Sequence, residues 1–325
     1  MSRFLRPWQL RCAKNTVLTL LPFRHQLQRI KRRFAKNPHP IDASSVYDGA
    51  YEHIEALQKK GLALSSSVIL EIGSGWYPVI PLMLRLAGTR HVYLTDAHPL
   101  LDAEQLAAAC QFLLDRKADI AQRLKLSLAD VEQYLRVNPG ETLDDGISRL
   151  GFSYLVPCDL ANCDFQVDAI VSHTCLEHIS GPDLRSLLQD CHHVLRPGGL
   201  MSHGVDHSDH RANTDRELSR IDFLKYSDRI WRLFCIDPQD YTNRLRHSDY
   251  VRLFSDAGYA IHFEQVLVDE PCRGFAEANR LDPRFGAKTV EDLATLWTHV
   301  ILIPEPAGAR PSAGAVSVKA PVPQP

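Results

Sequence analysis

An apolar stretch runs into two closely spaced glycines, an arrangement that can bring the backbone close to a ligand. Residues 68–72 are apolar except for Glu71, and Gly73 and Gly75 follow them. Glycine there allows a tight turn, and N–H groups at the start of a following helix favour an anionic group. A nicotinamide-binding fingerprint needs a third glycine where Pro78 stands, which argues against a pyrophosphate cradle. An ordinary glycine turn is the alternative.

Two further acids follow apolar segments. Asp96 ends the second apolar run, 21 positions after Gly75, a spacing that suits an acid pairing with ribose hydroxyls. A helix N-cap or an exposed loop acid is the alternative for Asp96. Asp159 and Leu160 follow a third short run, and taken alone Asp159 is more typical of a turn.

Two later segments are more distinctive. Residues 168–179 read DAIVSHTCLEHI, and residues 194–200 read VLRPGGL. Together with the Glu71-x-Gly73-x-Gly75 turn, these segments resemble the first motif, the LEH segment and the LRPGG turn of class I S-adenosylmethionine-dependent methyltransferases. The resemblance is to the type 11 methyltransferase-domain proteins, including uncharacterised bacterial members, and it covers roughly residues 66–205 and the strands near the end. Tyr77 stands where that family often has a third glycine.

The resemblance implies an enzyme that uses S-adenosyl-L-methionine, whose sulfonium methyl is already activated. No metal or covalent intermediate is required for this chemistry. By position in the family's motifs, the cofactor would be bound by Glu71, Gly73 and Gly75 at its methionine end, Asp96 at the ribose, Asp159 and Leu160 at the adenine, and His173 beside the methyl-transfer site.

Residues 203–210, HGVDHSDH, combine imidazoles and carboxylates at the expected end of a strand. One interpretation is a catalytic set of Asp206, His207, Asp209 and His210, in which an acid orients a histidine base. A second is a metal site, because histidine and carboxylate suit zinc, manganese or iron. The third is a polar loop that caps a helix.

Three polar residues later in the chain are candidates for binding the acceptor. Asn243, Arg244 and Arg246 could hold a polar or anionic group, since arginine offers bidentate recognition. A solvated charged loop is the alternative.

These residues predict methyl transfer to a small or lipid-linked acceptor, with a sugar hydroxyl as one candidate. An inactive methyltransferase-like module that serves as a binding scaffold is the main alternative. A metal-dependent hydrolase using residues 203–210 is the third.

The surrounding pattern alternates strands with helices, which indicates an α/β protein. We expect a Rossmann-like, mostly parallel seven-stranded sheet with helices on both faces and helical lid insertions. The domain should span residues 42–303, with insertions at about 103–150 and 206–247. A disordered tail rich in Pro and Ala is expected at 304–325.

The N-terminal 41 residues form a basic arm with ten Lys/Arg and no acid, which leaves 27 bases against 39 acids, or −12, in the remainder. A helical, cationic pattern around Leu27, Ile30 and Phe34 suggests contact with an anionic membrane surface, although a free or targeting tail is an alternative. Nucleic acid is a poor fit to an acidic body. Eight cysteines without a C-x-x-C pair suggest a reducing, cytoplasmic setting, with contact possible at the inner face of a membrane.

Overall fold

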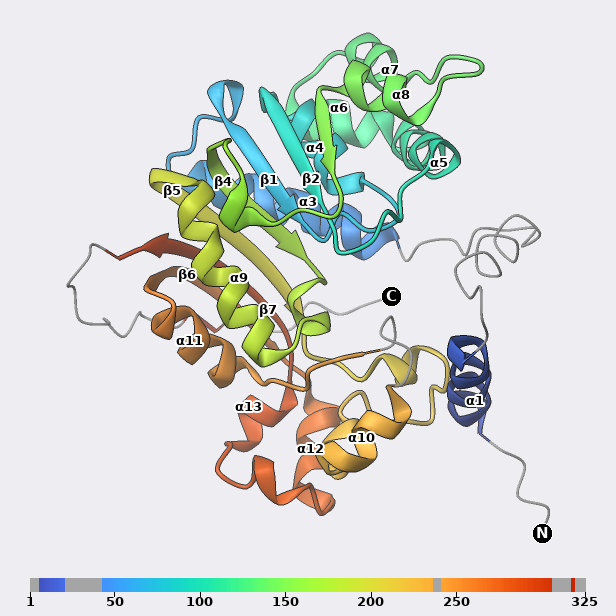
Figure 1. Cartoon of the computed structure of the whole chain (residues 1–325), viewed down its shortest axis with the longest axis vertical. Coiled ribbons are helices and arrows are strands. Elements are labelled where there is room, and N and C mark those ends of the chain that lie inside the picture. The colour runs from blue at the N-terminus through green and yellow to red at the C-terminus, as the bar shows by residue number, and fades with distance from the viewer. Residues whose placement is uncertain (1–5, 21–42, 236–240, 306–316, 319–325) are drawn as a thin grey trace.

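A single sheet organises the protein (Figure 1). The computed structural model describes residues 6–20, 43–235, 241–305 and 317–318. In chain order the strands are β1 (Val68–Ile72), β2 (His91–Thr95), β3 (Phe152–Leu155), β4 (Val167–His173), β5 (Leu195–Asp206), β6 (Tyr259–Val268), β7 (Thr295–Pro304) and β8 (Ser317–Val318). Their order in the sheet is β3-β2-β1-β4-β5-β7-β6-β8.

The sheet is mostly parallel, as predicted. β1 pairs in parallel with β2 and β4, β2 with β3, and β4 with β5, whereas β7 runs antiparallel to both β5 and β6. The seven expected strands are present, which confirms the Rossmann-like α/β prediction. The two-residue β8 extends the sheet beside β6 and lies in the segment expected to be a disordered tail, so that expectation fails at these two residues.

Helices cover both faces because the parallel strands are buried on both sides. Alternate residues point to opposite faces. Ile69 packs in the hydrophobic cluster under α3 (Ala43–Lys59) and α4 (Val79–Leu86), whereas Leu70 packs in the cluster under α9 (Gly181–Val194) and α11 (His247–Asp256).

The first insertion is part of a helical layer. It forms α5 (Ala103–Leu114), α6 (Lys117–Leu124), α7 (Leu128–Leu135) and α8 (Leu143–Leu150). Their apolar residues, among them Leu106, Ile120 and Val131, share one core with α3 and α4. The insertion, which was expected to form a lid, is therefore part of the helical layer that α3 and α4 form on one face of the sheet.

The second insertion builds a separate unit with a core of its own. It contains η4 (His210–Asn213), η5 (Asp222–Lys225) and α10 (Asp228–Phe234), and it packs with α12 (Glu270–Ala278), η7 (Pro283–Phe285) and α13 (Val290–Ala294), which come between β6 and β7. We call residues 207–235 and 269–294 the cap unit. Its core includes Phe223, Trp231 and Phe285. The contribution from 269–294 was not predicted.

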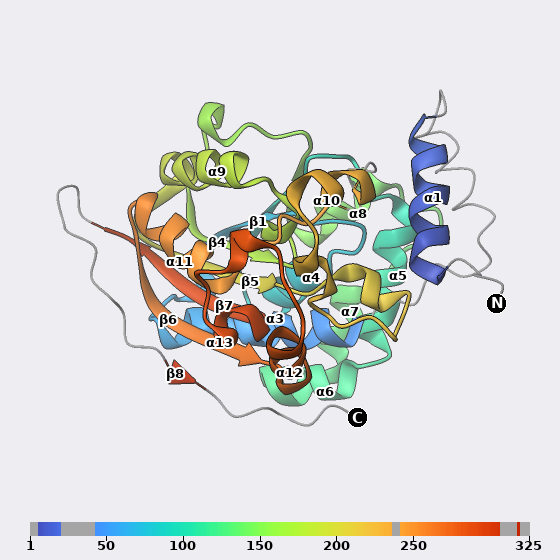
Figure 2. The same cartoon turned by 90° about the horizontal axis from the view of Figure 1, so that it is seen from below.

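The described part of the basic arm is a helix on the cap unit. In α1 (Pro7–Leu20), the Trp8 ring meets Phe234 edge-on at 5.2 Å between centroids. Just before the helix, Arg6 pairs with Asp215 at 2.8 Å. Figure 2 shows α1 at the periphery of the molecule. The predicted cationic helix around residues 27–34 lies outside the described residues.

Candidate functional site

The glycine turn is shaped by its neighbours at the carboxyl ends of β1 and β2. Gly73 and Gly75 have φ of +78° and +61°, in the region that favours glycine. A Cβ on Gly73 would lie 2.3 Å from the Cys175 sulfur, so a side chain cannot be accommodated without movement. The Gly75 N–H donates to Asp96 Oδ2 at 3.0 Å, and Asp96 Oδ1 accepts from the His98 N–H at 3.1 Å. Asp96 thus holds the turn that was predicted beside it.

Glu71 is a buried acid below this turn. Its side chain is almost wholly inaccessible, and Oε2 has no hydrogen-bond partner within the described part of the chain. Burial, reinforced by the nearby charge of Asp96, raises the pKa of Glu71 to about 8. The carboxyl group is therefore mostly protonated near neutral pH, and a cation beside it would favour its ionised form.

A second buried acid, Glu177, lies after β4. It belongs to η3 (Leu176–His178) and is only 3% exposed. Among the residues that the structure describes, neither carboxylate oxygen has a partner at hydrogen-bonding geometry, although the backbone N–H groups of Glu177 and Asp206 lie near the carboxylate. Burial, followed by the charge of Asp206, raises the pKa of Glu177 well above its usual value. Thr174, just before η3, has φ of +47°, which is unusual for a β-branched residue and marks strain at this edge.

Glu177 forms a cluster with two histidines, His178 and His210, and with another acid, Asp206. One ligand atom from each of Glu177, His178 and His210 lies within 4.8 Å of the other two. His210 Nε2 lies 3.3 Å from Asp206 Oδ2. Burial alone would raise the pKa of Asp206, but its bonds with His210 and Ser208 outweigh that effect and hold the pKa below its usual range. We call Glu177, His178, Asp206 and His210 the acid–histidine cluster.

The structure therefore brings together Asp206 and His210 of the predicted catalytic set. Glu177 and His178 were visible in the sequence only as part of the LEH segment and were not assigned to the site. The signal that could have identified Glu177 is its place in a short segment with apolar neighbours, Leu176 before it and Ile179 after it. An acid in such a segment is expected to be buried, and a buried acid needs a polar or charged partner.

The other two members of the predicted catalytic set, His207 and Asp209, bond to partners inside the protein. The buried His207 donates from Nδ1 to the Leu245 carbonyl at 3.3 Å, and its Nε2 is 2.9 Å from the Thr298 hydroxyl. Asp209 is fully buried, pairs with Arg211 at 2.6 Å and accepts from the Phe223 N–H at 2.9 Å. Both side chains bond to internal partners: His207 links the cap unit to β7, and Asp209 bonds within the cap unit.

The three predicted acceptor-binding residues, Asn243, Arg244 and Arg246, are buried and make hydrogen bonds inside the protein. The amide nitrogen of Asn243 donates to the carbonyls of Leu176 and Ile179 at 3.0 and 2.9 Å, and so holds η3 in place. Arg244 donates to two carbonyls of the cap unit and contacts Asp228.

Arg246 is fully buried and donates to the carbonyl oxygens of His207 at 2.7 Å, Leu293 at 2.9 Å and Thr295. Burial lowers its pKa to about 10. Apart from Arg244 Nε, which has no hydrogen-bond partner among the described residues, the nitrogens of these guanidinium groups donate inside the fold, where irregular backbone leaves carbonyls to be satisfied.

Three cofactor candidates have local roles in the structure. Asp159 is exposed, caps η2 (Leu160–Asn162) and accepts from the Ala161 N–H at 3.2 Å, while Leu160 is buried in the core. His173 lies between β4 and α3, with Nδ1 3.2 Å from His53 Nε2, and burial lowers its pKa to about 4. Gly49 makes room for the His173 ring, since a Cβ there would lie 2.1 Å from it.

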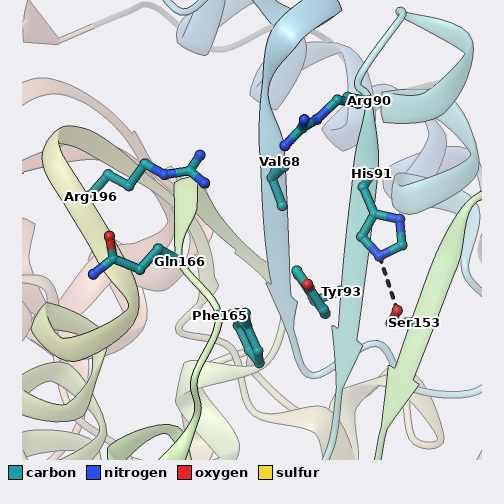
Figure 3. A pocket seen from close by; sticks show the side chains of 8 residues that line it. All are labelled: Val68, Arg90, His91, Tyr93, Ser153, Phe165, Gln166 and Arg196. Atoms are coloured by element: carbon teal, nitrogen blue, oxygen red, sulfur yellow. Dashed lines mark hydrogen bonds between the residues drawn. The ribbon is translucent and has the colours of Figure 1, made fainter.

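A surface hollow of about 500 Å³ lies elsewhere, among residues near the amino ends of the strands. Figure 3 shows its lining, with Arg90 and Arg196 on either side of Val68, and Tyr93 beside Phe165. Those two aromatic rings stack at 4.0 Å between centroids. This hollow is separated by the length of the strands from the turn and from the acid–histidine cluster, which lie at the carboxyl ends, where open α/β sheets bind ligands.

Comparison with known proteins identifies one family. Residues 148–202, which include β4, η3 and the start of β5, match the family model described as "Methyltransferase domain". None of the curated proteins matches the chain.

Several solved structures are similar at low identity. Magnesium protoporphyrin IX methyltransferase from Synechocystis PCC 6803, with bound SAH, is 11% identical, with a TM-score of 0.46 over 86% of this chain and 94% of that one. An S-adenosylmethionine-dependent methyltransferase from Mesorhizobium loti is 16% identical, with a TM-score of 0.41 over 79% and 99% of the two chains. One from Clostridium acetobutylicum is 10% identical, with a TM-score of 0.40 over 87% and 99%.

Proposed function

We propose that the chain is a class I S-adenosylmethionine-dependent methyltransferase that methylates an oxygen atom of a small or lipid-linked acceptor. A sugar hydroxyl is the leading candidate. The observation that carries this proposal is the acid–histidine cluster at the carboxyl ends of β4 and β5, where His210 and Asp206 are 3.3 Å apart.

The residues around the glycine turn fit the cofactor. The cofactor supplies a methyl group already activated on a sulfonium. The unpartnered Oε2 of buried Glu71 suits the ammonium of the methionine portion. Gly73 and Gly75 leave the backbone open to close approach, and Asp96 stands beside them for the ribose hydroxyls. Asp159 and Leu160, after β3, would meet the adenine.

The acid–histidine cluster suits an oxygen acceptor because a hydroxyl must lose its proton as the new carbon–oxygen bond forms. Asp206 and His210 are half-buried, so they can be reached by an acceptor and still be shielded from bulk water. A thiolate acceptor, which has already lost its proton, would have less need of such a group.

The test is methyl transfer from isotopically labelled cofactor to two pools, one of water-soluble glycosides and one of glycolipids. We expect label in a product that survives mild alkali, as an ether does and an ester does not. Asp96→Ala should lower cofactor binding and turnover together. Label only in amines, or no transfer to either pool from protein that binds cofactor, would overturn the proposal.

We also propose that α1 contacts an anionic membrane from the cytoplasmic side. Leu10 and Val17 of α1 expose 53% and 59% of their surface, and Ile230 and Leu233 of the adjoining α10 are exposed as well. Basic residues surround them in an arm without acids. Among the described residues, no helix is both long and apolar enough to cross a bilayer.

A further inference from the structure

Glu177 is a buried carboxyl group that the fold leaves without a protein partner. Buried acids are ordinarily hydrogen-bonded or paired, because removing a carboxylate from water is costly. Both oxygens of Glu177 lack a hydrogen-bond partner in the segments that the structure describes, although the residue is only 3% exposed. Asn243 fixes the backbone on either side of it, at the Leu176 and Ile179 carbonyls, so the side chain is held in this position.

The tautomer of His178, which belongs to the same cluster as Glu177, is fixed by a hydrogen bond. Its Nδ1 lies 2.7 Å from the Tyr241 carbonyl, which can only accept, so Nδ1 carries the proton. In the neutral ring, Nε2 is then the nitrogen with a lone pair. A backbone carbonyl that fixes the tautomer in this way is the usual outer partner of a metal-binding histidine.

His210 supplies the third donor from another element. It begins η4 after β5, and its ring centroid lies 5.1 Å from that of His178. Asp206 Oδ2 lies 3.3 Å from His210 Nε2 and orients the ring. The three donors come from two loops at adjacent strand ends.

We propose that Glu177, His178 and His210 bind a divalent transition-metal cation, with Mn²⁺ and Zn²⁺ as the best fits. One carboxylate and two imidazoles suit these ions. With bonds of about 2.1 Å, neighbouring ligands of a tetrahedral ion lie about 3.4 Å apart, so donors now within 4.8 Å of one another need to close by up to about 1.4 Å. The cation supplies the partner that buried Glu177 lacks.

Three protein ligands leave coordination positions open for an acceptor oxygen. This role, unlike cation binding itself, rests on the proposed function. A hydroxyl bound to the cation is more acidic than a free one. Its O–H bond breaks, the proton passes to the Asp206 carboxylate, and the oxygen takes the methyl group as the carbon–sulfur bond of the sulfonium breaks.

The experiment is a titration of the metal-free full-length chain with Mn²⁺, followed by electron paramagnetic resonance, with Zn²⁺ as competitor. We expect one Mn²⁺ per chain, displaced by Zn²⁺. Glu177→Gln and His210→Ala should each weaken binding at least about ten-fold. His262→Ala, which removes an exposed histidine on β6, is the matched control and should bind as the wild type does.

Two further measurements keep the outcomes separate. Urea unfolding of the metal-free proteins should show Glu177→Gln at least as stable as the wild type, since it removes a buried ionisable group, so its loss of binding is not loss of fold. Calorimetry with S-adenosylhomocysteine should be unchanged by metal removal. Absence of Mn²⁺ and Zn²⁺ binding, or equal binding by Glu177→Gln, overturns the metal site, whereas metal binding without cofactor binding overturns only the proposed function.

Discussion

At the scale of single residues, Glu71 links cofactor binding to pH. Its pKa is raised to about 8 by burial and by Asp96, and Cys175 is the other titratable group beside it. A ligand ammonium favours the ionised carboxylate, so the affinity for S-adenosylhomocysteine should rise by up to about ten-fold per pH unit between about 6 and 7.5. The rise should flatten near pH 8, where the ligand's own amino group also titrates. Isothermal calorimetry measures this directly.

Glu71→Gln is the control, because it keeps the shape and removes the charge. Its affinity should be lower than that of the wild type and nearly constant over the same pH range. If the wild-type affinity were itself constant, Glu71 would not meet the ammonium.

At the scale of elements, replacing Arg246 tests whether the buried arginines stabilise the fold by donating to backbone carbonyls. Arg246→Met leaves the carbonyls of His207, Leu293 and Thr295 without their donor. Each unsatisfied buried group costs about 1–3 kcal/mol, so the free energy of unfolding should fall by about 3 kcal/mol or more. Urea denaturation measures the change.

Arg252→Met, on the helix α11 that begins directly after Arg246, is the matched control. Its side chain is exposed, and we expect a change within about 0.5 kcal/mol. If the two variants were equally stable, Arg246 would not be needed for the fold, and the prediction that it binds the acceptor would be favoured.

The sheet could be predicted because its information is local. Apolar runs such as 68–72, followed by Gly73 and Gly75, specify both a strand and the turn after it. The direction in which Arg244 and Arg246 point is not local. A polar residue in a loop looks the same in sequence whether it faces an acceptor or a buried carbonyl, and here the carbonyls come from the cap unit.

The cap unit itself could not be predicted for a similar reason. Trp231 and Phe285 stand far apart in the chain and share a core only once β6 and β7 have brought residues 269–294 beside α10. The half of the acid–histidine cluster that was predicted, Asp206 and His210, lies in one short segment. The other half, Glu177 and His178, depends on β4 and β5 being neighbours.

At the scale of the whole molecule, buried histidines should make the fold sensitive to acid. His53 on α3, His203 on β5 and His299 on β7 are buried, and burial lowers the pKa of each, to about 3 for His203 and about 4 for His299. Below pH 6.5 the unfolded chain binds protons at these residues and the folded chain does not. Each should therefore reduce the free energy of unfolding by about 1.4 kcal/mol between pH 7.5 and 5.5.

His299→Gln isolates one of these contributions, because Gln can keep the contact that His299 Nε2 makes with the Ser202 hydroxyl at 2.9 Å. The stability of the wild type should fall by about 1.4 kcal/mol more than that of the variant over this pH range, as measured by urea denaturation in matched buffers. Parallel pH curves would mean that His299 is protonated equally in both states.

The periphery of the molecule offers the last test, at α1. Leu10 and Val17 are seven residues apart and so share one face of the helix, away from the buried Trp8 that anchors it. Replacing both by Asp should weaken binding to vesicles containing phosphatidylserine by about ten-fold or more, because it removes apolar burial and adds charge repelled by the lipid. Leu128→Asp, at a leucine of α7 that is 50% exposed, is the matched control and should bind as the wild type does in a sedimentation assay. Equal loss in both variants, or no binding by the wild type, would show that α1 is not a membrane contact.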